Sequence, residues 1–181
     1  LFFIICKWLY KIIIYILRYK IHVSINLDYI DILNPHIKKT LISKIKSHNI
    51  GSYLTLEILE SEKVSNFNIV NDFIAEVKKY GVKIAIDDFG TGFSNYENIL
   101  NLNIDYIKID GSLIKKIDED IYLNLIKSIV LFSKQQKIKV VAEFVSDLKI
   151  LRYVKNIGID YSQGYYIGKP TNINELIEEK E

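Results

Sequence analysis

Six short segments of the chain share one pattern, in which apolar residues alternate with others and a polar residue comes last. They are residues 22–26, 53–57, 84–88, 104–110, 139–143 and 159–163. Because successive side chains of a strand point to opposite sides, one phase of each strand is apolar, as at Leu54 and Leu56, and suits packing against helices. The other phase ends in a polar group, as at Glu57 or Glu143. The pattern predicts strands that deliver polar side chains to one common edge.

Segments with helical periodicity separate these strands. We predict helices over residues 35–47, 67–80, 119–136 and 148–156, a short helix after Ser94, and another from Asn172 or Asn174. Asn66, Asp118 and Asp147 are the predicted N-caps, and Gly81 ends the second helix. Strands that alternate with helices predict parallel βα units. The fold class is therefore α/β, a (β/α)8 TIM-like barrel whose function lies at the carboxyl ends of its strands.

The most informative stretch is residues 84–94, in which an apolar strand runs into Asp87 and Asp88 and then into a turn with Gly90 and Gly92. Two adjacent carboxylates repel each other unless a cation or a strong donor lies between them. Glycines permit a sharp turn and close approach of the backbone to a ligand. The stretch indicates a hard-metal site, and helix capping by the two acids is the alternative interpretation.

Composition indicates one globular domain, because 181 residues with 49% hydrophobic content suffice for a core. A net charge of +2 is too small to steer the chain toward a nucleic-acid polymer or a membrane surface. Cys6 is the one cysteine, so no internal disulfide forms and a reducing cytoplasm is the expected setting.

The chain contains no methionine and begins inside an apolar segment, so we expect a longer parent protein. A complete barrel needs ~250 residues, so we expect the first one or two strands to lie upstream. Residues 1–20 are predicted to form an outer barrel helix, and a membrane segment is the alternative. Lys7, Lys11 and Arg18 share one helical face, and a charged stripe of this kind is rare in a membrane helix.

Several motifs along the chain resemble those of the bacterial EAL domains. Asp87–Ser94 resembles the DDFGTGxS loop, residues 106–110 the YIKID strand, and residues 24–26 the S-x-N strand. Residues 56–61 resemble LELTES, residues 140–143 VVAE, and residues 163–170 QGYYFSRP. Six motifs in the family's order make the resemblance specific over nearly the whole chain. We therefore interpret residues 1–181 as a single partial EAL domain.

The resemblance implies a (β/α)8-type barrel that uses Mg²⁺ or Mn²⁺, one or two ions, to open the cyclic dinucleotide c-di-GMP into linear pGpG. It implies Asn26, Glu57 and Asp87 as ligands of a first metal, and Asp88 and Glu143 at a second. It implies that Lys108 contacts the attacking water or a phosphate oxygen, with Asp88 and Glu143 also catalytic. The implied substrate or loop-support residues are Gln163, Glu60, Ser94, Gly90 and Gly92.

The chain departs from the family's pattern at several positions. The Glu-Ala-Leu tripeptide is absent, Phe144 stands for a glycine, Ser146 for an acid, and Lys169 for an arginine. Phe144 is expected to crowd the pocket, and Asp147 is one candidate to compensate for the acid lost at Ser146. We therefore expect the chain as given to hydrolyse c-di-GMP poorly or not at all.

Two other functions remain as alternatives: a catalytically inactive EAL module that binds c-di-GMP or a protein partner as a sensor, and an unrelated metal-dependent barrel hydrolase. Structural interpretations also stand beside the functional ones, with Lys108 as a surface lysine, Gln163 as a core amide and Asp110 as a strand-end acid. The expected partners are c-di-GMP, a second copy in a homodimer, and an upstream sensory or diguanylate cyclase domain. The full-length protein is expected to be cytoplasmic or anchored in a membrane upstream.

Overall fold

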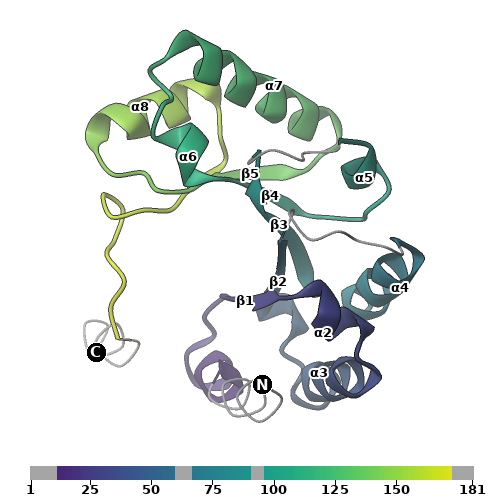
Figure 1. The fold of residues 1–181 in the computed structure, drawn as a ribbon. Helices are drawn as coiled ribbons and strands as arrows, with labels where there is room; N and C mark the ends of the chain where they lie inside the picture. Colours follow the sequence, from purple (N-terminus) through teal and green to yellow (C-terminus); the bar gives the residue numbers. More distant parts are fainter. Residues whose placement is uncertain (1–11, 60–66, 91–95, 173–181) are drawn as a thin grey trace. The chain divides into compact units, whose positions relative to one another are not determined.

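The computed structural model describes residues 12–59, 67–90 and 96–172 and has an α/β fold (Figure 1). Its strands follow one another in sequence order in a six-stranded sheet. They are β1 (Val23–Leu27), β2 (Leu54–Leu59), β3 (Lys83–Phe89), β4 (Tyr106–Ile109), β5 (Lys139–Ala142) and β6 (Tyr161–Ser162). The pairs β1–β2, β2–β3 and β5–β6 are parallel. The predicted fold class and strand order are confirmed.

The chain divides into two compact units, Leu1–Ile107 and Lys108–Glu181. The helices of the first are α2 (Tyr29–Leu33), α3 (Pro35–His48), a 3-10 turn (Gly51–Tyr53), α4 (Phe67–Lys78) and α5 (Tyr96–Leu100). Helix α2 packs against both α3 and α4 (Figure 1). Asn34 caps α3 because its side chain accepts hydrogen bonds from the backbone N–H groups of His36 and Ile37. The sequence pattern did not predict α2.

Residues 12–19 are helical, and Ile13 and Ile16 are buried. This segment belongs to the predicted helix over residues 1–20, whose first eleven residues lie outside the described part of the chain. Among the described residues, no helix is both long and apolar enough to cross a membrane.

The second unit contains α6 (Gly111–Ile114), α7 (Asp120–Gln135) and α8 (Leu148–Ile157). Asp147 caps α8 by accepting the Ile150 N–H at 2.9 Å, as predicted. The predicted cap of α7 was wrong, because Glu119 holds the N-cap position. The carboxylate of Asp118 instead accepts a hydrogen bond from the Lys149 ammonium at 2.6 Å. The predicted C-terminal helix lies largely outside the described residues.

The strands bury the phase predicted to pack against helices. Leu54, Leu56, Ile84, Ile107, Ile109 and Val140 are almost completely buried. Strand β1 differs, since Val23 and Ile25 are only half-buried. This strand is the first in the sheet order and has a described neighbour on one side only, so fewer side chains cover it.

In each unit, one aspartate accepts hydrogen bonds that hold the starts of two neighbouring strands together. Asp105 accepts the Ile84 N–H at 2.9 Å and the Lys83 ammonium at 3.0 Å. Asp160 in the second unit accepts the Val140 N–H at 2.9 Å and the Lys139 ammonium at 2.6 Å. Burial alone would raise the pKa of Asp105, but hydrogen bonds from lysines and from the backbone hold it below its ordinary value. These contacts stabilise the sheet at the ends of the strands opposite the predicted site.

Candidate active site

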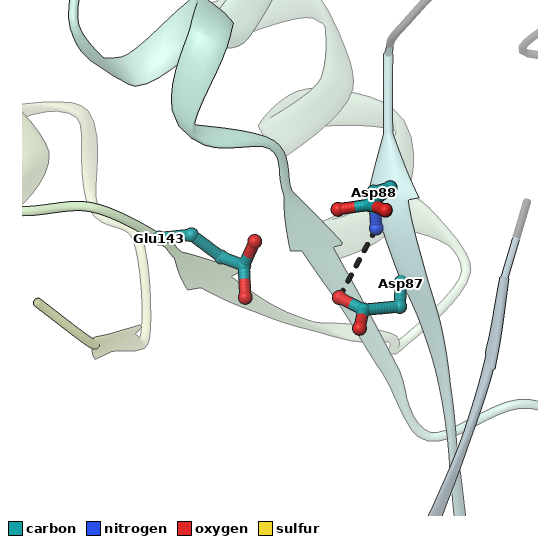
Figure 2. Close-up of side chains that lie close together, drawn as sticks. All are labelled: Asp87, Asp88 and Glu143. Carbon is teal, nitrogen blue, oxygen red and sulfur yellow. Dashed lines mark hydrogen bonds between the residues drawn. The ribbon is translucent and has the colours of Figure 1, made fainter. Parts of the chain in front are cut away.

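The carboxylates of Asp87 and Asp88 lie at the end of β3 in the first unit (Figure 2). Asp87 is buried, with 7% of its surface exposed, and Asp88 is half-buried. The backbone of Asp88 is left-handed, with a φ of 55°, which aspartate tolerates better than most residues do. In this conformation the Asp88 N–H donates to Asp87 Oδ1 at 3.1 Å (Figure 2). The turn therefore orients the Asp87 carboxylate and directs the two acids differently.

Asn26 and Glu57 lie on the two preceding strands of the same unit. Their Cα atoms are direct partners in the parallel register of β1 and β2. Glu57 in turn lies opposite Ala85, so Asp87 is two residues further along β3, on the same face. Glu57 is half-buried and Asn26 is exposed. The register therefore brings the three predicted ligands to the same ends of three adjacent strands.

Lys108 and Glu143 form a buried ion pair in the second unit. The Lys108 ammonium lies 2.9 Å from Glu143 Oε1, and the two side chains are 8% and 11% exposed. Lys108 is on β4, and Glu143 follows β5 directly, with its N–H donating to the Ile109 carbonyl. The interpretation of Lys108 as a surface lysine was wrong. A carboxylate has two oxygens, so Glu143 can accept from Lys108 and still offer an oxygen to another group.

Three described carboxylates offer ligand atoms for a metal ion: Asp87 and Asp88 in the first unit, and Glu143 in the second (Figure 2). All of these donors are oxygens. Carboxylate oxygens suit hard divalent cations, whereas zinc sites generally use cysteine or histidine. Within each unit, these carboxylates therefore have the chemistry of metal ligands.

A pocket of about 510 Å³ lies beside Glu143 in the second unit. Its lining residues are Lys115, Glu143, Phe144, Ser146, Gln163, Gly164, Tyr165, Gly168 and Pro170. Gln163 is exposed, and its backbone is fixed by hydrogen bonds to Ala142 and Val145. Gly164 adopts a φ of 155°, and a Cβ there would come within 2.3 Å of the Val145 nitrogen. The glycine lets the loop after β6 lie directly against Val145.

The structure places the remaining predicted residues as follows. Asp110 caps α6 by accepting the Ser112 N–H at 2.8 Å, in agreement with its structural interpretation. Asp147, the candidate to replace the acid lost at Ser146, accepts from both the Ile150 N–H and the Ser146 hydroxyl. Gly90 is described, with a φ of 103°. Glu60, Gly92 and Ser94 lie outside the described residues.

Lys115 and Tyr165 line the pocket but were not singled out from the sequence. Tyr165 belongs to residues 163–170, so that motif was the available signal for it. Lys115 gave none, because a lysine after a short, unpredicted helix looks like any surface lysine.

Comparison with known proteins identifies the family of the chain. A family model described as "EAL domain" matches residues 7–170. The chain is 41% identical over 139 residues to cyclic di-GMP phosphodiesterase PdeA of Borreliella burgdorferi, covering 76% of this chain and 20% of that protein. It is 38% identical over 129 residues to cyclic di-GMP phosphodiesterase PdeF of Escherichia coli, covering 71% and 17%.

A solved structure described as "PaMucR Phosphodiesterase, c-di-GMP complex" superposes with a TM-score of 0.78 at 25% identity, covering 86% of this chain and 64% of that one. The chain spans about a fifth of the length of the curated relatives it matches. The family match extends across both units and includes every predicted site residue. The chain belongs to the EAL domain family.

Proposed function

We propose that this chain contributes to metal-dependent hydrolysis of c-di-GMP to linear pGpG. The observation that carries the proposal is the set of carboxylates Asp87, Asp88 and Glu143 at the ends of β3 and β5 in an EAL domain. The relatives named as c-di-GMP phosphodiesterases support the same substrate and reaction.

In this proposal, Asn26, Glu57 and Asp87 would hold one Mg²⁺ or Mn²⁺ ion, and Asp88 and Glu143 would hold the other. The all-oxygen donor set fits either cation. When bound, such ions polarise the phosphodiester and lower the pKa of a coordinated water. The burial of Asp87 and its hydrogen bond from Asp88 support a ligand role, since both hold the carboxylate in one orientation.

Hydrolysis adds one water across one phosphodiester bond. The water oxygen bonds to phosphorus, the bond from phosphorus to the ribose O3′ breaks, and a proton reaches that oxygen, which leaves a linear dinucleotide with a 5′-phosphate. We assign Lys108 to the attacking water or a phosphate oxygen, where its ammonium stabilises developing negative charge. The ion pair with Glu143 fixes that ammonium. Gln163 lines the adjacent pocket and is assigned to the ligand or the water.

Glu60, Gly90, Gly92 and Ser94 are proposed to support the loop after Asp87 in its working position. We further propose that the full-length protein acts in the cytoplasm, forms a homodimer and carries an upstream sensory or cyclase domain. The cytoplasmic setting rests on the single cysteine, Cys6, and the other two proposals rest on the family resemblance.

A binding module without catalysis is the second candidate, and two residues of the pocket favour it. Phe144 and Ser146 line the pocket where the family's motif has a glycine and an acid. Loss of an acid weakens a metal site, because Mg²⁺ parts reluctantly with its water and needs charged ligands. In this alternative the chain binds c-di-GMP and releases it unchanged.

The test measures conversion of c-di-GMP to pGpG by the natural full-length protein, with Mn²⁺ and with a chelator. Turnover that requires Mn²⁺ and disappears in Asp87→Asn supports the enzyme. Lys83→Met is the control, because it removes a charge at the opposite ends of the strands. Binding of c-di-GMP without turnover at saturating Mn²⁺ establishes the binding module, and the absence of both refutes the substrate.

A further inference from the structure

Phe144 lies in the pocket in a backbone conformation that few residues adopt. Its φ is 52°, in the left-handed region, and a side chain other than glycine there costs about 1–2 kcal/mol. Its side chain is nevertheless large, apolar and 54% exposed. Burial therefore does not account for an aromatic residue at this position. Strained positions of this kind cluster at ligand sites, so the contacts of the ring are informative.

Two neighbours from the same unit hold the Phe144 ring. The ring lies against Gly111 at the start of α6, where an added Cβ would come within 2.2 Å of Phe144 Cδ2. The Lys115 ammonium lies 4.3 Å from the ring centroid, which is close for a cation–aromatic contact. Lys115 is itself fixed at the end of α6, where its backbone N–H donates to the Gly111 carbonyl. Gly111 thus makes room for a ring that positions the Lys115 ammonium.

The Lys115 ammonium brings a positive charge to a pocket that is otherwise mostly uncharged. Of the described lining residues, Lys115 is the only cation and Glu143 the only anion. Glu143 already accepts from Lys108 in its buried ion pair. A volume of about 510 Å³ is in the range of pockets that hold small molecules. The pocket therefore offers one positioned positive group to a ligand of nucleotide size.

We propose that Lys115 binds a phosphate oxygen of the cyclic dinucleotide and that Phe144 is the residue that positions it. The proposal rests on the proposed function, because it takes c-di-GMP as the ligand. An ammonium paired with a phosphate forms a strong, charge-assisted hydrogen bond. A ring beneath the ammonium reduces the number of orientations open to a long, flexible side chain. The substitution of glycine by Phe144 then adds a substrate contact instead of only filling the pocket.

The experiment measures the Kd for c-di-GMP of the natural full-length protein by calorimetry in a chelator, so that turnover does not interfere. Lys115→Met is expected to weaken binding roughly tenfold or more, because a hydrogen bond to a charged group is lost. Lys115→Arg should retain most of the affinity. Lys116→Met is the matched control, since the Lys116 ammonium lies over Tyr122 at 4.7 Å and Lys116 is not a lining residue of the pocket. It should bind like the wild type.

Substitutions of Phe144 separate positioning from simple bulk. Phe144→Leu keeps a bulky apolar side chain and the backbone strain but removes the aromatic face, and should weaken binding about three- to fivefold. Phe144→Tyr keeps the aromatic ring and should retain wild-type affinity for c-di-GMP. In the double variant with Lys115→Met, the Phe144→Leu substitution should have no additional effect, because the cation that the ring positions is gone. The Kd of Lys115→Met should also depend less on salt than that of the wild type.

Four outcomes are informative. An unchanged Kd in Lys115→Met overturns the proposal, while the proposed phosphodiesterase function stands. Tighter binding in Phe144→Gly also overturns it, because the ring then only obstructs the pocket. If the wild type binds c-di-GMP neither in the chelator nor with Mn²⁺, both proposals fail. If Lys115→Met weakens binding but the wild type shows no turnover with Mn²⁺, the Lys115 contact is supported and the enzymatic function fails.

Discussion

The buried pair of Lys108 and Glu143 makes a quantitative prediction about stability. At 2.9 Å, two unit charges in an effective dielectric of 20 attract by about 6 kcal/mol. Removing both charges from water costs several kcal/mol per ion, so the intact pair contributes little on balance. Removing one partner is different, because it leaves the other charge buried and uncompensated. We expect Lys108→Met to lower the free energy of unfolding by about 3–5 kcal/mol.

The assay is thermal and urea unfolding in a chelator, so that no bound cation replaces the lysine. For a chain of this size the loss corresponds to a fall in Tm of roughly 6–20 °C. Lys83→Met is the matched control, because Lys83 lies 3.0 Å from Asp105 but is 52% exposed. It should cost less than about 1 kcal/mol. The double variant Lys108→Met/Glu143→Leu should recover much of the loss. Equal effects of Lys108→Met and Lys83→Met would refute the reasoning.

The remaining predictions concern the sheet, the pocket and the metal. Asp105→Ala should cost about 2 kcal/mol, because the Ile84 N–H loses its acceptor. The pKa of Asp105 is lowered in the folded state, so its contribution to the free energy of unfolding is present above its ordinary pKa and is lost as the pH falls below about 4. Acid unfolding of the wild type and of Asp105→Asn measures this loss. Gly164→Ala should cost about 1–3 kcal/mol through its clash with Val145, whereas Gly168→Ala, which meets nothing within 4 Å, should be neutral in urea unfolding. In thermal unfolding, Mn²⁺ at a hundred times its Kd should stabilise the wild type by about 2.7 kcal/mol and leave the stability of Asp87→Asn nearly unchanged. Equal stabilisation of both proteins would exclude Asp87 as a ligand.

The strands and long helices were predictable because their signals are local. Period-two alternation marked β2 to β5, helical periodicity marked α3, and the predicted cap Asp147 marked the start of α8. The N-cap of α7 was not predictable, because Asp118 pairs with Lys149, a residue 31 positions away. The short helices α2 and α6 carry too few residues for a helical period to show in the sequence.

The positions of the polar residues in or directly after the strands were also predictable, since each belongs to a recognisable strand segment. The contacts that fix these residues were not predictable. The sequence does not reveal that Lys108 pairs with Glu143 or that the Asp88 N–H holds Asp87, because these contacts depend on backbone geometry and on strands far apart in the chain. It shows Phe144 as a departure from a motif, but not that its ring holds the Lys115 ammonium.

The most direct test of the central claim is the product formed from c-di-GMP by the natural full-length protein, separated by chromatography, with Mn²⁺ and with a chelator. We predict pGpG as the product, full dependence on the added cation, and loss of turnover in Asp87→Asn with the fold retained by thermal unfolding. Undiminished turnover in Asp87→Asn, or hydrolysis that continues in the chelator, would contradict the account.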